Sequence, residues 1–216
     1  AHNHLKDTQF AVHDAANCLT VRCPWGNILH IYSTIDDPME TVSDSPRKMV
    51  KMHSEGGAYG PGRMAVRGNP GIRFLEVTCN PGSTPAIARF YEQMLLCTVT
   101  TLQQGRVAVT VGPGVHIVFV EIEDAVDYSD MVGVHLCVYT ADFKSLYKRL
   151  ADRSLIWTNP RFTHLDTCDT WEEAFQSRTL RFRDIVDLET GEQLLELEHE
   201  TRPLGHGQYL KVPKYE

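Results

Sequence analysis

Two side chains that could bind a divalent metal occur at the same point of two similar segments. Glu76 lies in GIRFLEVTCNPGSTPAIARFYEQML, and His135 lies in VGVHLCVYTADFKSLYKRLADRSL. A carboxylate and an imidazole suit an open metal site, in which the cation polarises substrate oxygens and stabilises an oxyanionic intermediate. Because repeated units place equivalent residues at equivalent points, Glu76 and His135 are candidates for one pocket.

The elements around these residues follow one plan. Each segment predicts an alternating apolar strand, a turn rich in capping residues and an amphipathic helix. Further strand-like runs follow each helix, and a turn separates the two runs of each pair. The runs are Arg106 to Val111 and Val115 to Ile122 after the first helix, and Leu180 to Val186 and Gln193 to His199 after the second. The unit reads strand–helix–strand–strand–strand, twice over.

Capping residues predict where two helices begin. Thr84 precedes Pro85, which suits an N-cap followed by proline at the first helical position. Thr170 with Glu173 matches a capping box. This box predicts a short extra helix over Trp171 to Gln176, inserted before the next strand.

Strand alternation separates core residues from cleft residues. In the last strand, Leu195 and Leu197 should face the helices, so Glu196 points to the opposite side. Glu76 and His135 lie on that opposite side of their own strands. Three ionisable groups can therefore converge on the concave surface of the sheet.

Several residues fill this plan in a recognisable order. Phe90 and Tyr91 lie at the centre of the first helix, Asp142 lies near the start of the second, and FRDIVDLETGEQLLELEHE begins at Phe182. Together they resemble the vicinal oxygen chelate superfamily, which includes glyoxalase I, bleomycin-resistance proteins and extradiol dioxygenases. The last segment is similar to the closing hairpin of that family, as is VRCPWGNILHIY from Val21. The resemblance implies an α+β fold of tandem βαβββ units, which form a curved mixed sheet with helices on its convex side.

The resemblance also implies where a metal would be held, on the first and fourth strands of each paired unit. Carried over to this chain, it gives Glu76, His135 and Glu196 as ligands of a divalent Fe, Mn, Ni or Zn ion. The fourth position falls on Val118, which cannot bind a metal. His116, two residues away on the same strand face, is a substitute.

The register of the last strand leaves an alternative. Counting from Gly191 as the turn glycine puts Leu195 at the ligand position, so Glu196 requires one extra residue in the turn. Glu198 is the fallback ligand on the same face, and Glu198 or His199 is the nearest candidate for proton transfer. Against these roles, a lone acidic residue on a late strand is usually a solvated edge charge.

Two functions are compatible with these residues. The first is a divergent small-molecule-binding or assembly module with a degenerate metal site, and Val118 favours it. The alternative is a metal-dependent lyase, isomerase or dioxygenase acting on a small oxygenated substrate. The expected partner is accordingly a small oxygenated ligand or another protein, with the chain as an oligomer or as a subunit of a larger assembly. The fold alone does not choose between them.

Other residues of the predicted cleft have two interpretations each. Arg181 and Arg183 alternate along one strand face and could receive a carboxylate or phosphate, but paired surface arginines usually form salt bridges. Cys137 shares a face with His135, and we interpret it as a small lining residue rather than a ligand. Trp157, in a polar loop, is predicted to line an opening.

The repeats define the domain organisation. Residues 71–204 form the paired units, and residues 1–32 supply only late strands of another unit, which predicts a missing N-terminal portion. His30 then lacks its partner unit and is structural or exposed. Residues 33–70 predict a linker, whose stretch from Gly56 to Gly62 lacks the preceding strand and the following Lys-Ser/Thr of a phosphate cradle. Residues 205–216 form a C-terminal tail.

Composition excludes some classes of partner. The formal charge of -7 and the pI near 5.8 argue against nucleic acid or an anionic membrane, because both need a basic surface. No apolar run reaches the roughly 18 residues that span a bilayer. The six cysteines are dispersed, which in a chain of 216 residues indicates reduced thiols of a soluble, intracellular protein. The organelle is not indicated by the sequence, since a targeting signal would lie on the N-terminal portion that we expect to be missing.

Overall fold

Three sheets organise the residues that the computed structural model describes, namely 5, 7–14, 18–22, 24, 28–32, 74–103, 105–112, 115–129, 134–207 and 209. The first sheet is antiparallel and contains the strands expected before residue 33, β1 (Ala11–Asp14), β2 (Cys18–Arg22) and β3 (Ile28–Tyr32). The predicted linker at 33–70, with its Gly56 to Gly62 stretch, lies outside the described residues. So does most of the predicted tail at 205–216.

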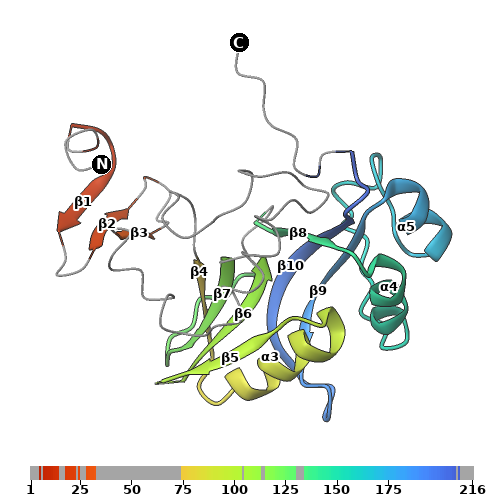
Figure 1. Cartoon of the computed structure of the whole chain (residues 1–216), viewed down its shortest axis with the longest axis horizontal. Helices are drawn as coiled ribbons and strands as arrows, with labels where there is room; N and C mark the ends of the chain where they lie inside the picture. The colour runs from red at the N-terminus through yellow and green to blue at the C-terminus, as the bar shows by residue number, and fades with distance from the viewer. Residues whose placement is uncertain are drawn as a thin grey trace, which may run out of the picture.

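The first repeat contains one strand, one helix and three further strands (Figure 1). Its sheet has the order β4-β7-β6-β5, in which β4 and β7 are parallel and the other pairs antiparallel. The helix α3 continues into a single π-helical turn, η2. The elements are β4 (Phe74–Cys79), α3 (Thr84–Phe90), η2 (Tyr91–Leu95), β5 (Val99–Leu102), β6 (Arg106–Gly112) and β7 (Val115–Glu121).

The second repeat follows the same path with one strand fewer. Its sheet has the order β8-β10-β9, in which β8 and β10 are parallel. The α+β class and the mixed sheets are therefore confirmed, although the strands of the two repeats belong to two sheets rather than one. The elements are β8 (Leu136–Thr140), α4 (Phe143–Ala151), α5 (Trp171–Ser177), β9 (Leu180–Val186) and β10 (Gln193–Pro203).

Residues 155–169 replace the predicted strand between α4 and β9 with turns. The backbone N–H of Trp157 still donates to the carbonyl of Arg181 on β9, at 2.9 Å. Asn159 then accepts the backbone N–H of Arg161 at 2.9 Å, and Pro160 has no N–H for a ladder. This Asx-type turn ends pairing with β9 after its first hydrogen bond.

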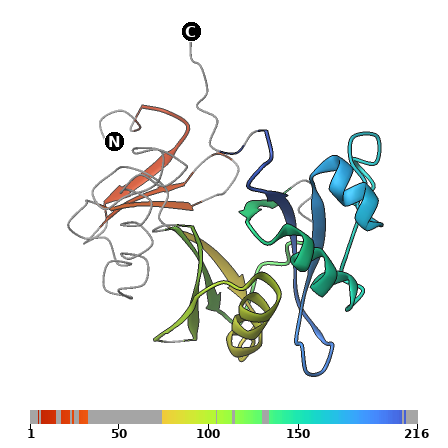
Figure 2. The same ribbon diagram turned by 45° about the vertical axis from the view of Figure 1, so that its right-hand side comes forward.

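One hydrophobic core joins the two repeats. Helix α3 packs on β6 and β7 of its own repeat and on β9 of the other, and Figure 2 shows it between the two groups of strands. The ring centres of Phe90 and Phe182 are 6.0 Å apart, and those of Tyr91 and Phe119 are 5.3 Å apart. All four side chains are fully buried, and such burial stabilises the fold by roughly 1.5–3 kcal/mol per side chain. The opposite sheet faces are left to carry polar groups.

The helix starts agree in part with the sequence predictions. The N-cap of α3 is Ser83, one residue before the predicted Thr84. Thr84 instead donates its N–H and hydroxyl to the carboxylate of Glu121, at 2.9 and 2.7 Å, which joins the helix start to the end of β7. The capping box of Thr170 and Glu173 is present at the start of α5.

Candidate functional site

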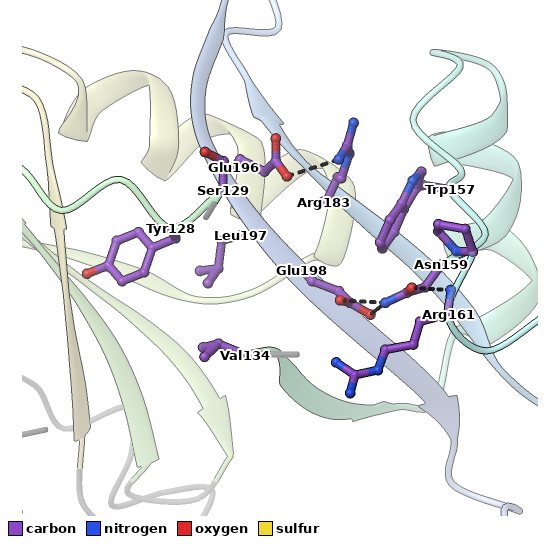
Figure 3. Close-up of a pocket in the computed structure, with 11 residues that line it drawn as sticks. Tyr128, Ser129, Val134, Trp157, Asn159, Arg161, Arg183, Glu196, Leu197 and Glu198 are labelled. Atoms are coloured by element: carbon purple, nitrogen blue, oxygen red, sulfur yellow. Dashed lines mark hydrogen bonds and ion pairs between the residues drawn. The ribbon is translucent and has the colours of Figure 1, made fainter. Parts of the chain in front are cut away.

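A pocket of about 240 Å³ lies against β9 and β10 (Figure 3). Loops from both repeats complete its wall: the segment after β7, Val134 just before β8, and the turns at 157–161. Trp157 lines this pocket, as the sequence predicted for an opening. The lining residues are Tyr128, Ser129, Val134, Trp157, Asn159, Pro160, Arg161, Arg183, Glu196, Leu197 and Glu198.

An irregularity in β10 presents three successive residues to the pocket. The ladder with β9 pairs Glu196 with Asp184 and His199 with Phe182, so β10 has one residue more than β9 in this interval. A β-bulge of this kind changes the direction of side chains locally. Glu196, Leu197 and Glu198 consequently all line the pocket, although Leu197 also belongs to the core.

Cross-strand ion pairs neutralise the carboxylates of the pocket. Arg183 donates to Glu196 at 3.0 Å, and its guanidinium lies 5.0 Å from the ring centre of Trp157. Arg181 donates to Glu198 at 2.8 Å. The salt-bridge interpretation of the two arginines is therefore confirmed, but Arg181 is only 4% exposed and is not a surface residue.

Arg181 is the centre of a buried ionic network beneath the pocket. Besides Glu198, it contacts Glu200 at 2.7 Å and Asp166 at 3.5 Å. Burial opposes the charge of Arg181, but Glu200 and the other carboxylates outweigh that effect and raise its pKa. Arg202 also pairs with Glu200. Buried charges are tolerated because each one faces an opposite charge.

Asn159 connects this network to the loop of the pocket. Its amide nitrogen donates to both carboxylate oxygens of Glu198, at 3.1 and 3.0 Å. Its amide oxygen accepts the backbone N–H of Arg161. Only one orientation of the amide satisfies both contacts, since a carboxylate accepts and an N–H donates. The position of Arg161 is thus determined by a residue that is itself buried.

The three predicted metal ligands form contacts with three different partners. Glu76 forms an ion pair with Arg106. His135 lies just before β8, and its Nε2 is 3.6 Å from a carboxylate oxygen of Glu200. Glu196, as described above, pairs with Arg183.

The candidate ligands are not gathered into one group among the described residues. Across the described parts of the chain, no group of three His, Cys, Asp or Glu side chains could hold an ion. The register prediction for the fourth position holds, because Glu76 pairs directly with Val118 between β4 and β7. His116 is buried and lies 3.3 Å from the hydroxyl of Thr110. A metal at Glu76 would face a valine and would have to displace a guanidinium.

The position of His199 does not suit the proton-transfer role that the sequence suggested for it. This side chain is fully buried, stacks on Phe182 with ring centres 4.4 Å apart and does not reach the pocket. Its Nδ1 lies 2.7 Å from the carbonyl of Leu197 and its Nε2 lies 2.8 Å from the hydroxyl of Tyr91. Because a carbonyl only accepts, we assign the proton to Nδ1, and Tyr91 donates to Nε2. Burial lowers the pKa of His199 to about 4, so the imidazole is neutral.

Glu198 does line the pocket, but Asn159 and Arg181 already engage its oxygens in three hydrogen bonds. The sequence reasoning did not identify Asn159, Arg161 or Tyr128 as pocket residues. The Asn159-Pro160 dipeptide was the available signal, because such pairs mark turns and loop residues commonly form sites.

Four cysteines of the two repeats have free thiols. Cys79, Cys97, Cys137 and Cys168 form no disulfide. Burial raises the pKa of Cys137, which disfavours the thiolate that a metal would need. Helices of sufficient length and apolar character for a bilayer are not found among the described residues.

Comparison with known proteins gives distant structural likenesses. No family model matches the chain, and no curated protein matches it significantly. A possible glyoxalase from Bacillus cereus is 14% identical, with 62% of this chain and 99% of that chain covered and a TM-score of 0.41. The oxidase ChaP-H2 is 18% identical, with 64% and 98% covered and a TM-score of 0.43. A trypanothione-dependent glyoxalase I from Leishmania major is 12% identical, with 62% and 87% covered and a TM-score of 0.41. Likenesses this distant identify no activity, so function has to be inferred from the residues of this chain.

Proposed function

We propose that this chain is a divergent vicinal oxygen chelate protein that binds a small oxygenated molecule in the pocket over β9 and β10. In this proposal, Glu76, His135 and Glu196 do not hold a catalytic metal. The parallel pairing of the first and last strands in both repeats supports the assignment to this superfamily. The pocket supports a binding role, because convergent polar groups beside apolar walls are typical of small-molecule sites.

The observation that carries the proposal is the pairing of the candidate ligands with arginines. Arg106 engages Glu76, and Arg183 engages Glu196. Charge-assisted hydrogen bonds from a guanidinium are among the stronger polar contacts, and they occupy the lone pairs that a cation would use. A divalent ion at these positions would also lie beside two positive charges. The alternative, a metal-dependent lyase, isomerase or dioxygenase, therefore has the weaker support.

Metal loading and ligand binding test the proposal together. The purified chain is equilibrated with excess Mn²⁺, Fe²⁺, Ni²⁺ or Zn²⁺, dialysed and subjected to elemental analysis. We expect substoichiometric metal in the native chain and no difference in His135→Ala or in the control His30→Ala. In parallel, small carboxylates and amides should shift the indole N–H resonance of Trp157. One equivalent of metal that is lost in His135→Ala but retained in His30→Ala would establish the metal-dependent alternative instead.

A further inference from the structure

One charged side chain of the pocket lining has no ion-pair partner among the described residues. Arg183 pairs with Glu196, and Glu198 pairs with Arg181, which also contacts Glu200 and Asp166 beneath the pocket. Arg161 remains, and its guanidinium forms no ion pair or hydrogen bond with any residue that the structure describes. Its backbone, by contrast, is held by Asn159. The guanidinium of Arg161 can therefore donate two parallel hydrogen bonds to an anion at the pocket wall.

The other lining residues can hold the apolar part of a ligand between two walls (Figure 3). Tyr128, Val134 and Leu197 lie on one side, and Trp157 lies on the other. Tyr128 is anchored because its hydroxyl accepts the backbone N–H of Thr78 at 3.0 Å. One face of Trp157 contacts the guanidinium of Arg183, which restrains the indole. The aromatic walls are therefore held in place before any ligand arrives.

We propose that the ligand of this pocket is a small monoanionic carboxylate with an apolar or aromatic body. The carboxylate binds the guanidinium of Arg161, and the body packs between Tyr128 and Trp157. This inference rests on the proposed binding function and adds the chemical class of the ligand. The volume of about 240 Å³ is below the roughly 300–1,000 Å³ of pockets for drug-sized ligands, which restricts the body to about one ring.

The paired carboxylates explain the preference for a single negative charge. Glu196 and Glu198 line the same cavity as Arg161, and their own counter-charges are already engaged. A second negative charge on the ligand would gain no partner and would approach these two groups. A phosphate monoester dianion should thus bind no better than a carboxylate, although both can form two hydrogen bonds with one guanidinium.

Four probes with one ring and different head groups test this inference: benzoate, benzamide, benzylamine and phenyl phosphate. Binding is measured by nuclear magnetic resonance titration of the Trp157 indole N–H, assigned with Trp157→Phe. We expect benzoate to bind about tenfold more tightly than benzamide, because its contact with Arg161 is charge-assisted. Benzylamine should bind most weakly. Added salt should reduce the advantage of benzoate, since Arg161 is exposed.

Arg161→Gln and a matched control identify the residue responsible. In Arg161→Gln, the affinity for benzoate should fall about tenfold, to that for benzamide. Arg153→Gln makes the same charge change at an exposed arginine outside the pocket, one that donates to the carbonyl of Leu188, and should leave the affinity unchanged. Thermal melts confirm that both variants are folded.

The outcomes separate the inference from the function on which it rests. Equal binding of benzoate and benzamide to the native chain would overturn the anion preference and leave a binding pocket. Tighter binding of phenyl phosphate would overturn the single-charge argument. A benzoate preference that survives in Arg161→Gln would assign the anion to another residue. Failure of every probe to shift the Trp157 resonance would overturn both the inference and the binding function.

Discussion

Arg181→Met provides the sharpest test of the ionic network beneath the pocket. Methionine retains much of the side-chain length but removes a guanidinium that contacts Glu198, Glu200 and Asp166. The wild-type side chain is 4% exposed, so water does not replace the lost contacts. Three carboxylates would then share a partly buried space with Arg202 as the only arginine still paired to one of them in the described residues.

The burial of Arg181 determines how much unfolding free energy the substitution should remove. Removing one partner of a buried ion pair typically costs about 3–5 kcal/mol, because the charge left behind remains desolvated. Arg183→Met is the matched control, since Arg183 lies two residues away on the same strand face but its side chain is 39% exposed. An exposed pair contributes about 0–1 kcal/mol, and the contact with Trp157 adds about 0.5–1 kcal/mol. We therefore expect a loss of about 4 kcal/mol for Arg181→Met and about 1 kcal/mol for Arg183→Met.

Urea denaturation at pH 7 measures both losses by linear extrapolation, provided the variants share one slope. Equal losses for the two variants would refute the assignment of Arg181 as a buried counter-charge.

Three further predictions concern buried hydrogen bonds. Between pH 6.5 and 4 the free energy of unfolding should fall by up to about 3 kcal/mol on account of His199. The pKa of His199 is about 4 in the native chain and about 6.5 in the unfolded chain, so within this range each pH unit of acidification favours the unfolded state by about 1.4 kcal/mol. Urea titrations of His199→Gln at several pH values should lack this pH-dependent loss of stability. Tyr91→Phe should cost about 1–3 kcal/mol at pH 7 in the same assay, because it leaves Nε2 of His199 without a donor, and a change below 0.5 kcal/mol would contradict the assigned hydrogen bond. Asn159→Asp should lower the melting temperature by several degrees at pH 7, because it sets a second carboxylate against Glu198, and an unchanged melting temperature would argue against this repulsion.

The sequence predicted the regular parts of the fold because hydrophobic periodicity and turn chemistry act locally. The capping box at Thr170 and the strand from Leu180 to Val186 follow from such patterns. The register that faces Glu76 with Val118 came instead from the family resemblance. The alternation that directed Leu195 toward the core also directs His199 there, two steps beyond Leu197. The sequence therefore contained the signal against His199 as a cleft residue.

The ion pairs of the site could not be predicted in the same way. The simultaneous contact of Arg181 with Glu198 and Glu200 depends on the position of the bulge in β10, which no local pattern marks. The contact between Arg106 on β6 and Glu76 on β4 depends on how these two strands are aligned through β7, although 30 residues separate them in sequence. The repeat plan predicted three strands after each helix, and the loss of one of them at 155–169 could not be read from the plan, because one turn at Asn159 ends the pairing with β9.

The segment at 155–169 has a second consequence, for the behaviour of the protein in a crowded solution. The outer edge of β9 would otherwise present unpaired backbone groups, and open edges recruit strands from other molecules. Here the carbonyl of Arg181 accepts from Trp157, and its N–H donates to the sulfur of Cys168. The loop that gives the pocket its residues thereby also covers the β9 edge at Arg181. Substitutions that reshape this loop for a new ligand would uncover backbone groups to which another strand can pair.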